Sequence, residues 1–196
     1  MGSSGSEENR IRKLIIRDEV DKIKMGQPCV DCDKIYEPYC MDFDHKNNKK
    51  MSISAMIQNR FGLKKIILEI KKCELVCVLC HRKRTHDNLL INKLPDSEIS
   101  KHGRHSRKYR IRHQKLLEEY KNKPCAICNE NFPHYQMEFD HLKDKIECIS
   151  VMISKRRPIV NIVEEINKCQ IICSLCHRRK SVKEFEKKWN NFRIIS

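Results

Sequence analysis

Two short segments combine residue types that could hold a divalent cation and activate water. Asp44-His45 ends an alternating polar and apolar stretch, and His81 directly follows the last cysteine of a paired set. A carboxylate and an imidazole can bind a metal ion, and a second imidazole can take a proton from water. The combination points to metal-assisted hydrolysis. The plainer interpretation of an Asp-His pair is a capped strand end with a hydrogen-bonded histidine.

The same residues recur 96 positions further on, as Asp140-His141 and His177. The segment 124–181 aligns with 28–85 without a gap, and 24 of the 58 positions are identical. Chance similarity does not preserve every motif cysteine, every motif histidine and the spacing together. The chain therefore contains an internal duplication.

Paired cysteines flank each Asp-His segment and suit structural zinc. Two Cys-x-x-Cys pairs can supply four thiolates in a tetrahedron, and their joint duplication argues against a redox role or unrelated buried cysteines. No secretory signal is visible, so metal binding is favoured over disulfides. The predicted ligands of two zinc ions are Cys29, Cys32, Cys77 and Cys80 in the first copy and Cys125, Cys128, Cys173 and Cys176 in the second.

Hydrophobic patterning predicts the elements that position these groups. A helix is expected over 7–24, a strand ending at His45, an amphipathic helix over 63–73, a short strand over 75–77 and a helix from about Cys80. The second copy repeats this order, with its leading helix over 104–122. The expected fold class is α+β, with two tandem zinc-stabilised modules that each follow a basic amphipathic helix.

Composition sets the domain organisation. With 39% hydrophobic and 34% charged residues, the 196-residue chain is poorly suited to one large core. We expect a tail or tag remnant over 1–6, a first module over 7–91, a linker over 92–103, and a second module with a C-terminal helix over 104–196. No apolar run is long enough to span a membrane, so we expect an intracellular protein, in the cytoplasm or nucleus of a host or associated with a virion.

The formal net charge of +15 favours a polyanionic partner, although a well-solvated basic surface would give the same number. Two basic positions shared by the copies could contact phosphates or simply face solvent: Lys49 with Lys145, and Arg60 with Arg156. The expected partner is double-stranded DNA, branched and nicked forms included, bound by a monomeric pseudo-dimer.

Together, Cys-x-x-Cys, Phe-Asp-His and Lys-Cys-x-x-x-Cys-x-x-Cys-His-Arg resemble the HNH endonuclease family with its ββα-metal core, above all its small phage, bacterial and large-DNA-virus members. The resemblance covers nearly all of both modules. It implies that His45 and His141 are general bases and that Arg82 and Arg178 lie near the phosphate. It also implies that a catalytic Mg²⁺ or Mn²⁺ is bound by Asp44, His81, Asp140 and His177.

One position departs from that family. Many members carry Asn shortly before the second cysteine pair, where this chain has Lys72 and Lys168. In the family this Asn mainly orients the base or its loop, so the change bears on efficiency more than on chemistry. The expected function is a metal-dependent DNA endonuclease with two tandem sites. The alternatives are a non-catalytic DNA-binding or packaging protein that retains the duplicated zinc fold and a zinc-stabilised protein-interaction module.

Overall fold

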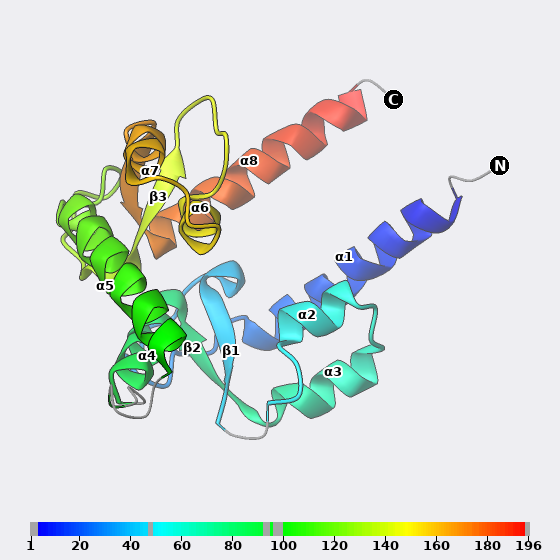
Figure 1. Ribbon diagram of the computed structural model, residues 1–196. Coiled ribbons are helices and arrows are strands. Elements are labelled where there is room, and N and C mark those ends of the chain that lie inside the picture. Colours follow the sequence, from blue (N-terminus) through cyan, green and yellow to red (C-terminus); the bar gives the residue numbers. More distant parts are fainter. Residues whose placement is uncertain (1–3, 47–48, 92–94, 96–99, 195–196) are drawn as a thin grey trace. The chain divides into compact units, whose positions relative to one another are not determined.

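The computed structural model describes residues 4–46, 49–91, 95 and 100–194. The chain is an α+β protein whose described strands form two separate two-stranded antiparallel sheets (Figure 1). It divides into two compact units, Met1–His81 and Arg82–Ser196.

The first unit begins with α1, Ser4–Lys24, and continues through the short 3-10 helix η1, Pro38–Cys40, into β1, Met41–His45. Two short helices follow, α2 over Ile53–Gln58 and α3 over Leu63–Ile70. The chain then returns through β2, Cys73–Cys77, and enters α4, Val78–Ile91. The hydroxyl of Ser52 accepts a hydrogen bond from the Ala55 amide at 3.2 Å and so caps α2.

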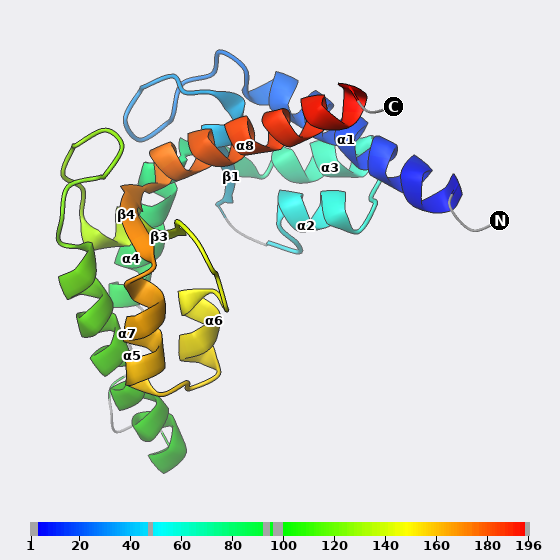
Figure 2. The same ribbon diagram turned by 90° about the horizontal axis from the view of Figure 1, so that it is seen from above.

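The second unit repeats this order after α5, Lys101–Lys121. It contains η3 over His134–Gln136, β3 over Met137–His141, α6 over Ile149–Ser154 and α7 over Ile159–Ile166, followed by β4 over Cys169–Cys173 and α8 over Ser174–Ile194. Figure 2 shows α6 and α7 from above. The duplicated sequence therefore gives duplicated local structure.

The main core of the first unit lies between its helices. Ile16 and Val20 of α1 pack with α2 and with Ile66 of α3, and Phe43 of β1 packs against them. In the second unit Ile149 and Met152 of α6 pack with Ile162 and Ile166 of α7 in the same way. Three apolar identities of the repeat are thus buried in both copies: Ile53 and Ile149, Met56 and Met152, and Ile66 and Ile162.

The strand register decides which residues can act together. In β1, Asp44 pairs with Glu74 and His45 pairs with Cys73; in β3, Asp140 pairs with Gln170. Because successive side chains of a strand point to opposite faces, Asp42 and Asp44 share one face, while Phe43 and His45 share the other. The Asp and His of each motif therefore point in different directions.

Several element bounds differ from those expected. Helix α1 begins at Ser4, within the segment 1–6 expected to be a tail, and α5 begins at Lys101 rather than 104. Most of the expected linker, 92–94 and 96–99, lies outside the described residues. The compact units divide after His81, not after Ile91, because α4 from Arg82 onward groups with the second unit.

Candidate metal centres

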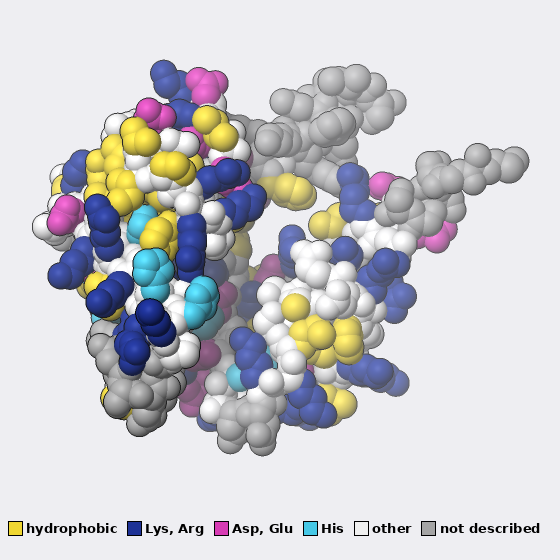
Figure 3. Space-filling view, viewed as in Figure 1, with side chains coloured by type: hydrophobic (Ala, Val, Ile, Leu, Met, Phe, Trp, Pro, Cys, Tyr) yellow, Lys and Arg dark blue, Asp and Glu magenta, His cyan; other side chains and the backbone are white. Residues whose placement is uncertain are grey.

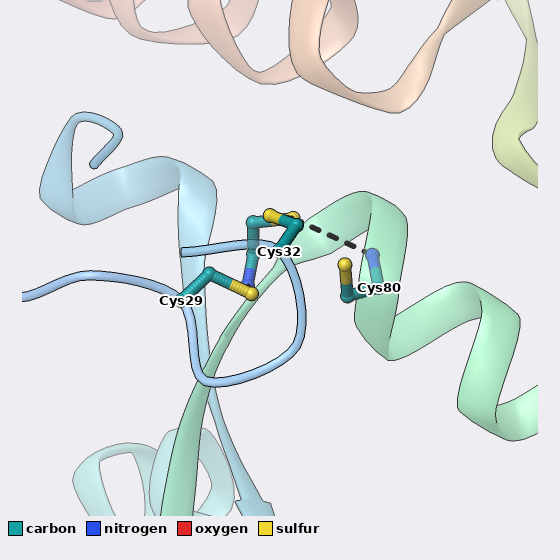
Figure 4. A group of neighbouring side chains, drawn as sticks. Cys29, Cys32 and Cys80 are labelled. Carbon is teal, nitrogen blue, oxygen red and sulfur yellow. Dashed lines mark hydrogen bonds between the residues drawn. The ribbon is translucent and has the colours of Figure 1, made fainter. Parts of the chain in front are cut away.

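Each unit gathers its four motif cysteines into one group. The sulfur atoms of each set lie within 4.8 Å of one another, and Cys32 Sγ is 4.0 Å from Cys77 Sγ. Thiolates about 2.3 Å from one tetrahedral zinc ion would be roughly 3.8 Å apart. Figure 4 shows Cys29 and Cys32 on the loop before β1 and Cys80 on α4, with their side chains converging. Both groups fit structural zinc.

Backbone hydrogen bonds shape the first cysteine pair of each group. The Asp33 amide donates to the Cys29 carbonyl at 2.8 Å, and Asn129 does the same to Cys125. Both residues have a positive φ, 57° and 58°, which Asp and Asn tolerate better than most residues. The tight turn that brings the two cysteines together is therefore encoded by an Asp or Asn directly after the pair.

Amide groups also point at the sulfurs. The Cys77 amide donates to Cys29 Sγ and the Cys173 amide to Cys125 Sγ, both at 3.2 Å. Burial alone would raise these thiol pKa values, but the amides lower the pKa of Cys29 to about 7 and of Cys125 to about 6. Such hydrogen bonds stabilise thiolate, the form that binds zinc.

A second group of polar side chains joins β1 to α4 in the first unit and β3 to α8 in the second. In the first unit His81 Nε2 is 3.6 Å from Asp44 Oδ1, and in the second His177 Nε2 is 3.7 Å from Asp140 Oδ1. Two ligands of one Mg²⁺ at about 2.1 Å would be roughly 3.0 Å apart at a right angle and roughly 4.2 Å apart across the ion. The observed separations lie about 0.6 Å above the right-angle value, so a small side-chain movement would bring the two groups to the spacing of adjacent ligands.

The other nitrogen of each imidazole has a carboxylate partner. Asp42 Oδ2 is 3.0 Å from His81 Nδ1, and Glu138 Oε2 contacts His177 Nδ1. A carboxylate on Nδ1 fixes the proton there and directs the Nε2 lone pair outward, an arrangement common around metal-binding histidines. Burial also lowers the pKa of His177, although Asp140 opposes this, and a neutral imidazole is the form that binds metals.

The two Asp-His pairs have different surroundings. Asp140 Oδ2 accepts hydrogen bonds from Lys180 Nζ at 2.6 Å and from Gln170 Nε2 at 2.7 Å. The strand position opposite Asp44 is Glu74, whose carboxylate pairs with Lys46 Nζ at 2.9 Å. At the strand position opposite the Asp, the second copy therefore has the amide of Gln170, whereas the first copy has the carboxylate of Glu74.

His45 and His141 contact other elements. His45 Nε2 is 3.1 Å from Glu69 Oε1 on α3, and His141 Nε2 is 2.9 Å from Glu165 Oε1 on α7. Both histidines lie on the strand face opposite the Asp that faces His81 or His177. The structure thus brings Asp44 together with His81, and Asp140 with His177, but it sets the expected general bases against a helix.

The expected phosphate-binding arginines follow His81 and His177 directly. Arg82 belongs to the second compact unit, where its guanidinium donates to Glu138 Oε1 and, at 3.4 Å, to the Tyr135 carbonyl. Glu138 is therefore shared between Arg82 and His177. Arg178 lies in the first turns of α8.

Three kinds of residue at these centres were not expected. The carboxylates behind the histidines, Asp42 and Glu138, are acidic in both copies, and strand alternation places them on the same face as Asp44 and Asp140. Glu69 and Glu165 are identical at the repeat offset, which was a usable signal. Lys180 gave only a weak signal, a basic residue matched by Arg84 in the first copy, and only the folded chain places Lys180 on Asp140.

Comparison of the chain with family models, curated proteins and solved structures gives no match. In the part of the chain that the structure describes, no helix has the length and apolar character needed to cross a membrane. Functional inference therefore rests on the centres themselves.

Proposed function

We propose that the chain is a metal-dependent DNA endonuclease of the HNH type, with two zinc-stabilised ββα-metal modules and one hydrolytic site in each. The observation that carries the proposal is the facing pair Asp44 and His81, backed by Asp42 and repeated as Asp140 and His177 backed by Glu138. Two carboxylates on opposite nitrogens, present twice, are better explained by a cation.

Asp44 with His81, and Asp140 with His177, would hold Mg²⁺ or Mn²⁺, which when bound stabilises the charge that develops on the phosphate. His45 and His141, each the last residue of its strand, would take a proton from the attacking water, with the scissile phosphate lying across that strand end, where both faces can be reached. The water oxygen then forms a bond to phosphorus, the bridging P–O bond breaks with its electron pair on the leaving oxygen, and solvent protonates that oxygen. The four-cysteine zinc sites would hold the fold and take no part in hydrolysis.

DNA as the substrate is supported by charge. Lys and Arg side chains are spread over the described part of the face shown in Figure 3. On α5 the exposed basic residues include Arg104, Lys108, Arg110, Arg112 and Lys115. Such surfaces bind phosphates through counterion release and without sequence preference.

Cleavage of supercoiled plasmid with Mg²⁺ or Mn²⁺ tests the proposal. The wild type should convert plasmid to nicked or linear forms, and the double variants His81→Ala/His177→Ala and His45→Ala/His141→Ala should cut at least ~100-fold more slowly. A matched control, His102→Ala/His105→Ala, removes two histidines of α5 that are exposed and should keep wild-type activity. Plasmid binding by the wild type without cleavage would favour the non-catalytic DNA-binding alternative instead.

A further inference from the structure

Each unit has one buried glutamate among its described residues, on a helix that packs beside the strand of the Asp-His motif. Glu69 on α3 is 6% exposed and Glu165 on α7 is 1% exposed. Both helices are amphipathic, and both glutamates lie on the face that carries Ile66 or Ile162 into the core. An apolar residue would suit such a position, because a buried carboxylate loses its hydration.

Both glutamates make the same two polar contacts, one to a histidine and one to a lysine. One carboxylate oxygen contacts the imidazole Nε2 of His45 or His141, at 3.1 Å and 2.9 Å. The other oxygen accepts a hydrogen bond from Lys72 at 2.6 Å in the first unit and from Lys168 at 2.8 Å in the second. The Ile146 amide adds a further donor to Glu165 at 2.9 Å. The Lys-Glu-His chain is therefore a repeated unit.

These contacts determine which imidazole nitrogen is free to act. A carboxylate on Nε2 favours the tautomer with its proton on Nε2, so the lone pair lies on Nδ1. Among the described residues, the buried side-chain polar atoms without a partner are Tyr109 Oη and His113 Nε2, so neither motif histidine buries an unpartnered Nδ1. Nδ1 is thus the nitrogen available to accept a proton.

We infer that Glu69 and Glu165 are positioning residues for the two general bases, and that Lys72 and Lys168 hold the glutamates in place. The inference rests on the proposed function. It also gives a role to the lysine that stands where many HNH proteins have Asn: here a Lys-Glu pair orients the histidine. When Nδ1 takes the proton from water, the imidazolium formed lies against the glutamate carboxylate, which stabilises it.

The test uses full-length zinc-loaded protein and the double variant Glu69→Gln/Glu165→Gln, which keeps side-chain size. We expect kcat for plasmid cleavage to fall about 10- to 100-fold with little change in KM, because the base is misdirected while DNA contacts remain. Nitrogen-15 NMR should show the Nε2–H tautomer for His45 and His141 in the wild type and a mixture of tautomers in the variant, because the Gln amide can either accept from Nε2 or donate to it. The matched control is Glu164→Gln, an exposed glutamate beside Glu165 on α7.

A second variant separates misdirection of the histidine from a general loss of the fold. Lys72→Met/Lys168→Met keeps the Glu-His contact, so we expect a smaller fall in kcat and an unchanged tautomer. If the wild type cuts and the Glu→Gln protein cuts equally fast with both zinc ions bound, the inference is wrong and the proposed function stands. If the wild type does not cut at all, the proposed nuclease function and the positioning role of the glutamates are both wrong, whichever tautomer is observed.

Discussion

Lys180 places its ammonium group 2.6 Å from Asp140 Oδ2, on the carboxylate that faces His177 Nε2. The lysine thereby supplies a positive charge where the proposed cation would add two more. Its pKa is raised by the hydrogen bond to Asp140, so it remains charged at neutral pH. Lys180 would therefore compete with the proposed cation for Asp140.

Removal of that charge should strengthen metal binding by the second unit. We expect Lys180→Met to tighten Mn²⁺ binding there by about three- to tenfold, which corresponds to roughly 1 kcal/mol. Electron paramagnetic resonance of free Mn²⁺ in a titration measures this without any cleavage assay. Lys183→Met is the matched control, because it removes an exposed lysine from the same helix. Unchanged or weaker binding in Lys180→Met would refute competition by this lysine.

The carboxylates behind the histidines should also affect metal affinity. We expect Asp42→Asn to weaken Mn²⁺ binding at the first site about 10- to 100-fold, because His81 would lose the partner that directs Nε2 toward the ion. Asp33→Asn serves as a control: the second copy already has Asn129 at that turn, so this variant should bind Mn²⁺ like the wild type. Equal affinity of Asp42→Asn and wild type would mean that His81 needs no orienting group.

Metal analysis tests the two four-cysteine centres. The purified chain should contain about two zinc ions, and Cys80→Ser should lower this to about one while destabilising the first unit, since a structural zinc site contributes directly to folding. Cys148→Ser is the control, because Cys148 is exposed and lies outside both groups. A chain that retains two zinc ions after Cys80→Ser would contradict the assignment.

The buried glutamate of the second unit should remain ionised in mild acid. The hydrogen bond from Lys168, aided by Ile146 and His141, lowers the pKa of Glu165 from 4.5 to about 2 despite its burial. Because this pKa is lower in the folded chain, the carboxylate contributes stability that is fully present above about pH 4.5 and is lost as the pH falls toward 2.

Carbon-13 NMR of the side-chain carboxyl groups measures this directly, with the Glu165 signal assigned by its absence from Glu165→Gln. At about pH 4.5 an ordinary glutamate is roughly half protonated. The Glu165 signal should still have the shift of the ionised form, in samples whose zinc content has been checked. A midpoint near the ordinary glutamate value would show that the Lys168 contact does not hold in solution.

Much of the fold could be predicted because its signals are local. The helical periodicity of 63–73 predicted α3, the alternation before His45 predicted β1, and paired cysteines predicted the two four-cysteine groups. The leading helix was predicted to within a few residues. Helices α2 and α6 were not predicted, because six residues are too few to show a helical period.

The centres were only partly predictable, because their geometry depends on strand alternation and on contacts between distant elements. Sequence order places Asp44 and His45 side by side, yet the strand directs them to opposite faces, one toward His81 and the other toward Glu69. The shared arginines Arg60 and Arg156 were candidate phosphate contacts. In the structure each donates to the leading helix of its own unit, to Asn9 and Ser106 respectively.

The four-cysteine sites also help to fix the strand register. Cys77 donates its amide to Cys29 Sγ and pairs with Met41 across the sheet, so the four-cysteine group fixes one end of a strand pair only five residues long. A slip of one residue would exchange the faces of every side chain in β1 and turn Asp44 away from His81. A chain that folded without its zinc could therefore lose the proposed metal ligands and displace the proposed base in a single step.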